Sequence, residues 1–227
     1  MVFTVEKSSL NGSDSHIHFI VLCNPGCLLG AGEKNKKGTF IKMTLSGLTG
    51  TPSPGQLHLS CLVQGAEIVV GTTTYLADFH GRLKILLNID QLAQFRSGGI
   101  SLVPLLIQEQ VFDGIGDSIG SIMVRKDLDR DPLPSTLMAI IVGHPFPAIH
   151  EIVINSHAAI PHLLPDITLR NKILPGRESA ILRDPQAMSF PPKNGVYTLV
   201  EPMELEDVNN PGPVLATIKS FPLTASF

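Results

Sequence analysis

Apolar and polar residues alternate with a period of two along most of the chain, and this pattern predicts β-strands. In residues 56–63, for example, Leu57, Leu59 and Cys61 alternate with polar neighbours, so one face of this strand would be buried. Gly, Pro and Asn residues separate such runs at intervals of about ten residues, a spacing typical of antiparallel sandwiches and barrels. The runs predicted as strands are residues 16–22, 39–45, 56–63, 66–70, 73–79, 82–89, 100–107, 121–126, 136–142, 149–154, 196–201 and 214–219. We therefore expect a mostly β fold, an antiparallel sandwich or barrel of jelly-roll-like form.

Helical periodicity is rare in this sequence. Residues 88–95 form the best helix candidate, because Asp90 could cap it and Leu92 and Phe95 would share one face. A parallel α/β fold needs a crossover helix of ten or more residues between its strands, and the pattern offers none of that length. We expect few short helices.

The prolines divide the chain into two compositionally different parts. Only four of the 18 prolines precede residue 131, and fourteen follow it. Because proline cannot donate a ladder hydrogen bond, residues 132–227 should not form an ordinary closed sheet throughout. We therefore predict a β-sandwich or barrel core over residues 1–131 and a Pro-rich, partly extended region over residues 132–227, packed on the core or on neighbouring subunits.

Composition and charge narrow the possible partners. Charged residues make up only 16% of the chain, against about 25% in typical domains. A weakly charged exterior is typical of a surface that other subunits cover, so the protein should be a homo-oligomer, with further protein partners possible. The net charge of −3 is spread evenly along the chain, which gives no indication of nucleic-acid binding. No apolar run approaches the roughly 20 residues of a transmembrane helix, although peripheral membrane contact stays open.

Two short motifs in the first forty residues could carry chemistry. His16 and His18 lie two residues apart at the start of a predicted strand, where both imidazoles could reach one metal ion. This H-x-H spacing resembles that of amidohydrolases, but here the apolar run follows the pair instead of preceding it, and the barrel helices are missing. The pair stays the metal-site candidate. Lys34, Lys36 and Lys37 form a basic turn that could contact an anionic surface.

One further group of residues resembles a metal site. Asp127, Asp129 and Asp131 alternate like the first ligands of a calcium loop, but the glycine and glutamate that such a loop requires are missing. Because Arg130 neutralises the group, a solvated charged loop is the favoured interpretation.

Three cysteines, an odd number, argue against a disulfide framework and favour a reducing compartment, either the cytoplasm or a virion.

No catalytic triad, P-loop or dinucleotide fingerprint is recognisable, and we expect no cofactor. The pattern favours a non-enzymatic, self-assembling structural protein, a viral matrix, capsid or shell-type subunit. Two alternatives stay open at this point. One is a β module that binds a protein or peptide by strand addition. The other is a metal-dependent hydrolase that uses His16 and His18.

Overall fold

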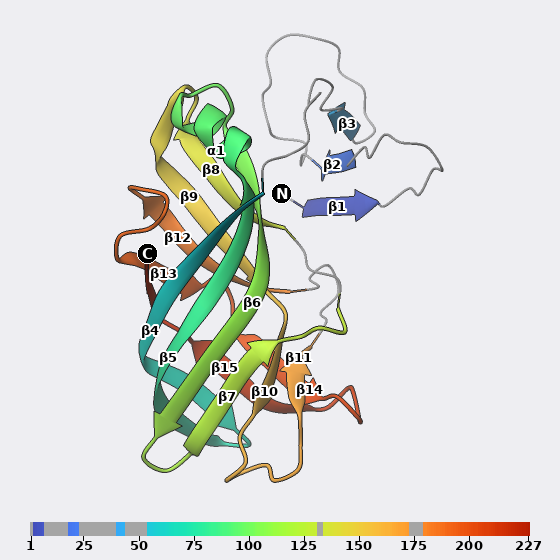
Figure 1. Cartoon of the computed structure of the whole chain (residues 1–227). Coiled ribbons are helices and arrows are strands. Elements are labelled where there is room, and N and C mark those ends of the chain that lie inside the picture. The colour runs from blue at the N-terminus through green and yellow to red at the C-terminus, as the bar shows by residue number, and fades with distance from the viewer. Residues whose placement is uncertain (1, 7–17, 23–39, 44–53, 131–133, 173–178) are drawn as a thin grey trace. The chain divides into compact units, whose positions relative to one another are not determined.

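A computed structural model of the chain describes residues 2–6, 18–22, 40–43, 54–130, 134–172 and 179–227 (Figure 1). The chain divides into two compact units, Met1–Thr51 and Pro52–Phe227. The first unit contains a three-stranded antiparallel sheet in the order β1 (Val2–Glu6), β2 (His18–Leu22) and β3 (Phe40–Met43). Only the backbone pairing of these three strands is described here.

The second unit is an antiparallel sheet of thirteen strands with one short helix among its described residues. The elements that form its first part are β4 (Pro54–Val70), β5 (Thr73–Asn88), α1 (Ile89–Arg96), β6 (Leu102–Gly116), β7 (Gly120–Lys126), β8 (Ser135–Ile141) and β9 (His144–Ile154). Those that follow are β10 (Ser156–Ala159), β11 (Leu169–Asn171), β12 (Ala180–Ala187), β13 (Gly195–Leu199), β14 (Met203–Asp207), β15 (Val214–Ser220) and β16 (Leu223–Ser226). The predicted mostly β, antiparallel fold class is confirmed.

The pairings close this sheet into two rings that share β4, β5 and β6. Ring 1 runs through the shared strands to β7, β10, β11, β14 and β15, which pairs back onto β4. Ring 2 runs through the same three strands to β8, β9, β12, β13 and β16, which also pairs back onto β4. Figure 1 shows the ring 1 strands around the lower half of the shared strands and the ring 2 strands around the upper half. Every strand of this sheet therefore has a neighbour on both sides.

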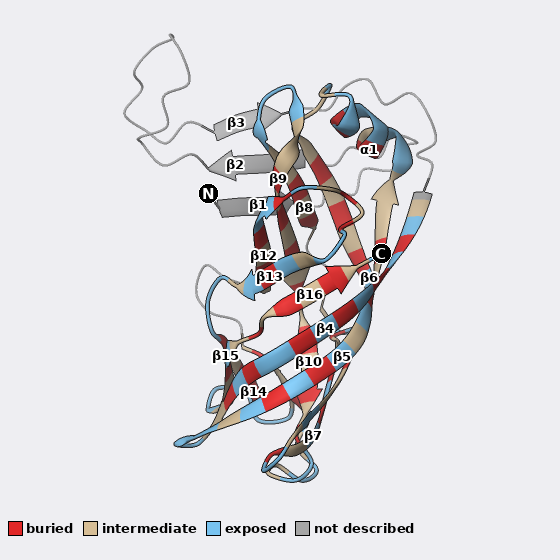
Figure 2. Ribbon diagram, turned by 90° about the vertical axis from the view of Figure 1, so that its left-hand side faces the viewer, coloured by how far each residue is buried: buried red, intermediate tan, exposed pale blue. Residues whose placement is uncertain are grey.

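The shared strands can serve both rings because two of them change outer partner half-way along. β4 pairs with β16 over Ser60–Val63 and with β15 over Glu67–Val70. The alternation of buried and exposed residues along β4 is interrupted there, between Val63 and Ala66. A bulge at this point returns Ala66 to the buried face of the strand. β6 likewise pairs with β8 near its start and with β7 near its end, with a register shift between. Figure 2 shows buried and exposed residues alternating along β4 and β5.

The proline-rich region supplies nine strands, β8 to β16, among its described residues. Most of its prolines lie between these strands, as in residues 160–168, 188–194 and 208–213. Pro185 lies inside β12, but in the register shift between Asp184 and Ala187, where no ladder donor is needed. The boundary after residue 131 stays a prediction, as does any contact of the later residues with neighbouring subunits.

The helix confirms one local expectation and corrects another, and the carboxyl end pairs within the chain. Leu92 and Phe95 are the buried face of α1, as predicted. The N-cap, however, is Asn88 and not Asp90, because the Asn88 Oδ1 accepts hydrogen bonds from the N–H groups of Asp90 and Gln91. The last strand, β16, pairs with β4 of the same chain, and its Leu223 is fully buried. The ordered end therefore docks on its own core.

Candidate metal centre

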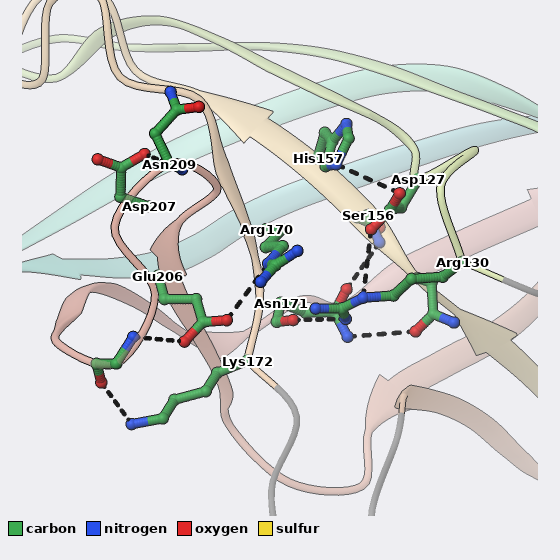
Figure 3. Close-up of polar contacts among 12 residues, drawn as sticks. Asp127, Arg130, Ser156, His157, Arg170, Asn171, Lys172, Glu206, Asp207 and Asn209 are labelled. Atoms are coloured by element: carbon green, nitrogen blue, oxygen red, sulfur yellow. Dashed lines mark hydrogen bonds and ion pairs between the residues drawn. The ribbon is translucent and has the colours of Figure 1, made fainter.

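The chain crosses from one ring to the other at three points that lie together beside the middle of β6. The chain leaves ring 1 after Lys126 at the end of β7, enters it at Ser156, the first residue of β10, and leaves it again after Asn171 at the end of β11. At such crossings the backbone leaves one ladder before it joins the next, so its polar groups need other partners. Side chains supply them here (Figure 3).

A network of buried polar side chains holds the crossings together. Asn171 is central: its Oδ1 accepts a hydrogen bond from the Ser156 N–H at 2.8 Å, and its Nδ2 donates to Asn155 Oδ1 at 3.2 Å. The Ser156 hydroxyl in turn accepts from Gln110 Nε2 at 2.8 Å, which ties β10 to β6. Arg130 Nη1 donates to the Asn171 carbonyl at 2.6 Å. These bonds satisfy groups that would otherwise cost about 1–3 kcal/mol each when buried.

Asp127 is the buried carboxylate of this network, with 1% of its surface exposed. Its backbone N–H donates to the Asn155 carbonyl, which fixes the residue where β7 ends. The Oδ1 atom accepts a hydrogen bond from the Asp129 N–H at 2.9 Å and lies 3.3 Å from His157 Nε2. The Oδ2 atom lies 3.4 Å from Arg130 Nε but makes no hydrogen bond to the described residues. A carboxylate this deeply buried persists as an ion only when it is compensated, and Arg130 is its counter-ion.

Asp127, Asp129 and His157 together offer a divalent ion three ligand atoms. One carboxylate oxygen from each aspartate and one imidazole nitrogen all lie within 4.8 Å of one another. Ligands at about 2.0–2.2 Å from a tetrahedral zinc ion lie about 3.3–3.6 Å apart, so a movement of up to about 1.5 Å would close the set. The exposed Asp129 side chain can make that movement, while Asp127 is fixed by burial. Within the described ranges, this is the single group of three such residues.

A small cavity adjoins this group. It has a volume of about 10 Å³ and is lined by Ile107, Gln110, Lys126, Asp127, Arg130, Val153 and Asn155. Among described residues, Gln110 Oε1 and Arg130 Nη2 are buried without a hydrogen-bond partner, like Asp127 Oδ2. Burial lowers the pKa of Arg130, and the charge of Asp127 opposes that effect. The arginine stays charged, because its ordinary pKa is so high.

The charges on the other side of His157 are already paired. Arg170 is its cross-strand neighbour on β11, and Arg170 Nε lies 3.3 Å from Glu206 Oε1 of β14. The other oxygen of Glu206 accepts a hydrogen bond from the Gly212 N–H at 2.9 Å. Glu206 is therefore occupied by structural partners and is not one of the ligands.

Ring 2 contains a second buried polar group, formed by His150 and Tyr197. Both residues are fully buried, and His150 Nδ1 lies 2.6 Å from the Tyr197 hydroxyl oxygen. Burial lowers the pKa of His150 to about 3 and raises that of Tyr197 above its ordinary value. The described part of the chain places no further metal ligand with this pair, so it is a core hydrogen bond.

The structure tests the predicted site residues unevenly. His16, Lys34, Lys36 and Lys37 lie outside the described residues, and of His18 only the backbone, in β2, is described. The metal role of the histidine pair and the anionic-surface role of the lysines stay predictions. Asp131 also lies outside the described residues.

The interpretation of the acidic run as a solvated loop is wrong for Asp127. This residue is buried, because Arg130 and His157 compensate its charge within the fold. The sequence analysis did not connect His157 with the acidic run. The pairing of β10 with β7 brings it to the acidic run, and no local motif signals that pairing.

Comparisons with known proteins support the fold but give no family. No family model matches the sequence, and no curated protein sequence matches it. A solved structure, that of DynF from the dynemicin biosynthesis pathway of Micromonospora chersina, is similar with a TM-score of 0.61 and 20% sequence identity. The match covers 77% of this chain and 81% of that chain. At this identity the likeness concerns the fold alone.

The prediction of a viral matrix, capsid or shell subunit is wrong. A solved structure that shares the fold is that of a protein from a biosynthetic pathway. The feature that had suggested a shell, a proline-rich carboxyl-terminal region, has an explanation within the single chain, because those residues close both rings. Closure also leaves the described strands of the thirteen-stranded sheet without the free edges that strand addition of a peptide requires. β1 and β3 pair on one side only in the described part of the first unit, so the peptide-binding alternative stays a prediction. Among the described residues, no helix has the length and apolar character to span a membrane. Oligomerisation, other partners and the reducing compartment stay predictions.

Proposed function

We propose that this protein binds a divalent metal ion through Asp127, Asp129 and His157. The observation that carries the proposal is the convergence of three ligand atoms within 4.8 Å on a carboxylate that is 1% exposed. The burial of Asp127 supports the proposal, because its backbone N–H donates to the Asn155 carbonyl and this contact holds one ligand in place.

The donor set favours a transition metal over calcium or magnesium. Imidazole nitrogen suits zinc, iron and related ions, whereas magnesium and calcium prefer oxygen ligands alone. Two carboxylates and one imidazole carry two negative charges, which a divalent cation would neutralise. Three protein ligands also leave coordination positions open, the arrangement by which catalytic zinc sites hold water or substrate. We therefore choose Zn²⁺ as the first ion to test and Mn²⁺ as the second.

We further propose small-molecule biosynthesis as the setting in which this protein acts. The support is the fold shared with DynF, which is described as a protein of the dynemicin biosynthesis pathway. In such a pathway a metal centre could bind or activate an oxygen-containing intermediate as a Lewis acid. The reducing compartment inferred from the thiols suits this setting.

Calorimetric titration of the full chain with Zn²⁺ tests the proposal. We expect one ion per chain for the wild type, and a Kd at least about 10-fold weaker in Asp129→Asn and His157→Gln, because each variant removes one ligand. Both side chains are at least partly exposed, so these variants should fold. Asp127→Asn should abolish binding, and circular dichroism would verify its fold.

Matched controls separate this site from other surface groups. Asp117→Asn and His162→Gln make the same chemical changes at exposed positions, and both should bind zinc like the wild type. The double variant His16→Gln/His18→Gln should also bind normally. Zinc binding that is lost in this double variant but kept in Asp129→Asn and His157→Gln would move the site to the histidine pair and refute the proposal, as would a wild type that binds no ion.

A further inference from the structure

We infer that one internal water molecule, bound by Gln110, Asp127 and Arg130, is a fixed part of the junction beside β6. Three polar atoms carry this inference: Gln110 Oε1, Asp127 Oδ2 and Arg130 Nη2. Each is buried and lacks a hydrogen-bond partner among the described residues, and all three residues line the same cavity. Buried polar atoms are seldom left unpaired, and internal water is a common partner for them.

The size of the cavity fits one water molecule and nothing larger. Its volume of about 10 Å³ corresponds to roughly the smallest space that accommodates a single water. Phosphate, a carboxylic acid or a substrate fragment would not enter without a rearrangement of the network. Polar side chains line part of the cavity, which distinguishes it from the wholly apolar cavities that stay dry.

The three unpaired atoms select water by their chemistry. Arg130 Nη2 is a donor, whereas Gln110 Oε1 and Asp127 Oδ2 are acceptors. A water molecule can accept one hydrogen bond from the guanidinium and donate one to each oxygen, which makes the usual three bonds of an internal water. A cation would face the charge of Arg130, and an anion would face that of Asp127. A small neutral molecule that both donates and accepts matches all three.

This water would determine how Asp127 presents its other oxygen. The water and Arg130 hold Oδ2, so that Oδ1 stays directed at Asp129 and His157. Ligating carboxylates are commonly oriented by such outer partners, and loss of one typically weakens metal binding about 10–100-fold. This positioning role rests on the proposed metal-binding function, whereas the water itself does not depend on it.

Two measurements on the metal-free full chain test for the water. In a high-resolution crystal structure we expect a density peak within hydrogen-bond distance of all three atoms. In oxygen-17 magnetic relaxation dispersion we expect the number of long-lived waters to fall by one in Gln110→Met. Ser156→Ala removes the other hydrogen bond of Gln110 but keeps its Oε1 acceptor, so this variant should retain the water. Gln108→Met is the exposed control and should retain it too.

Zinc titration then tests the positioning role. We expect the Kd for Zn²⁺ to rise about 10-fold in Gln110→Met and to stay unchanged in Gln108→Met. An empty cavity in the crystal, or equal numbers of long-lived waters in wild type and Gln110→Met, would refute the proposal of a bound water. A lost water with an unchanged Kd would overturn only its positioning role. A wild type that holds the water but binds no zinc would refute the metal function and leave the water established.

Discussion

The two junctions at which a long strand changes partner are built in different ways. At the β4 junction, β15 and β16 follow each other directly through Phe221 and Pro222, and the bulge in β4 contains Gly65 with φ +68°. The Gly65 N–H donates to Asp78 Oδ1 at 2.7 Å, and the site is exposed. At the β6 junction, β7 and β8 are joined by residues 127–134, and Gln110, Ser156 and Asn171 fill the gap with buried side chains.

This difference shows why chemistry is expected at only one junction. At β4 the backbone itself accommodates the change of partner, since a left-handed glycine turns the chain and water solvates the exposed polar groups. At β6 side chains fill the gap, bulk water is excluded, and each polar group must find its partner in the protein or in an internal water. Buried side chains with spare hydrogen-bonding capacity, such as Asp127, result from the second solution. A metal ion or an internal water can use that capacity.

The largest effect should come from removing the strands that complete both junctions. Truncation after His157 deletes the end of β10 and all of β11 to β16, and β4 then loses both of its outer partners, β15 and β16. Both rings would open and expose residues of the core. The loss should exceed the total stability of about 5–15 kcal/mol that such domains have. We expect no cooperative unfolding by circular dichroism, and a soluble, cooperatively folded fragment 1–157 would show that the rings are not one folding unit.

A smaller but still large effect should follow from Asn171→Leu at the β6 junction. The leucine has a similar volume, but it leaves the Ser156 N–H and Asn155 Oδ1 without their partner. We expect a loss of roughly 2–4 kcal/mol in urea unfolding, because each buried unpaired group costs about 1–3 kcal/mol. The exposed Asn210→Leu is the matched control and should change stability by less than about 0.5 kcal/mol. Equal stabilities for the two variants would mean that the junction tolerates water.

The sequence predicted the local elements better than their connections. The alternation of Leu57, Leu59 and Cys61 identified a buried strand face, and Leu92 and Phe95 identified the helix. The residues around Gly65 ended one predicted strand and began another, yet both belong to β4, because a bulge and a loop share the same local signals. A single sequence does not distinguish a strand that continues past a bulge from two strands.

Only part of the candidate site could be predicted from the sequence, for a related reason. Asp127 and Asp129 stood out as an alternating pair, but the charge of Arg130 made the run resemble a solvated loop. Whether a compensated carboxylate is buried depends on what covers it, which is a property of the tertiary structure. His157 reaches the site through the register of β10 against β7. Strand order and register are long-range properties, and neither residue spacing nor charge encodes them locally.

A pH titration distinguishes the interior of ring 2 from both junctions. Burial holds the pKa of His150 at about 3 in the folded chain, against about 6.5 when unfolded. The unfolded state therefore binds more protons between these values, and stability is lost as pH falls below about 6.5. We expect a loss of up to about 2 kcal/mol at pH 5 from this residue, at about 1.4 kcal/mol per unit. Urea unfolding at several pH values measures it.

Two variants determine whether His150 causes that slope. His150→Phe should be less stable than the wild type at pH 7, because the Tyr197 hydroxyl loses its partner, but its stability should depend less on pH. The exposed His58→Gln should keep the slope of the wild type. An unchanged slope in His150→Phe would assign the acid sensitivity to other groups, and the charged residues of the β6 junction would be examined next.

The smallest effect should come from Gly65→Ala at the β4 junction. The added methyl group meets nothing within 4 Å, so the cost is that of the left-handed backbone, about 1–2 kcal/mol. Gly71→Ala offers a matched comparison, because Gly71 has φ +61° in the turn between β4 and β5 and open space around it. Equal losses for the two variants in urea unfolding, with zinc affinity unchanged in both, would show that the β4 junction is only a local turn. A larger loss at Gly65, or weaker zinc binding, would show that the two junctions are coupled through the shared strands.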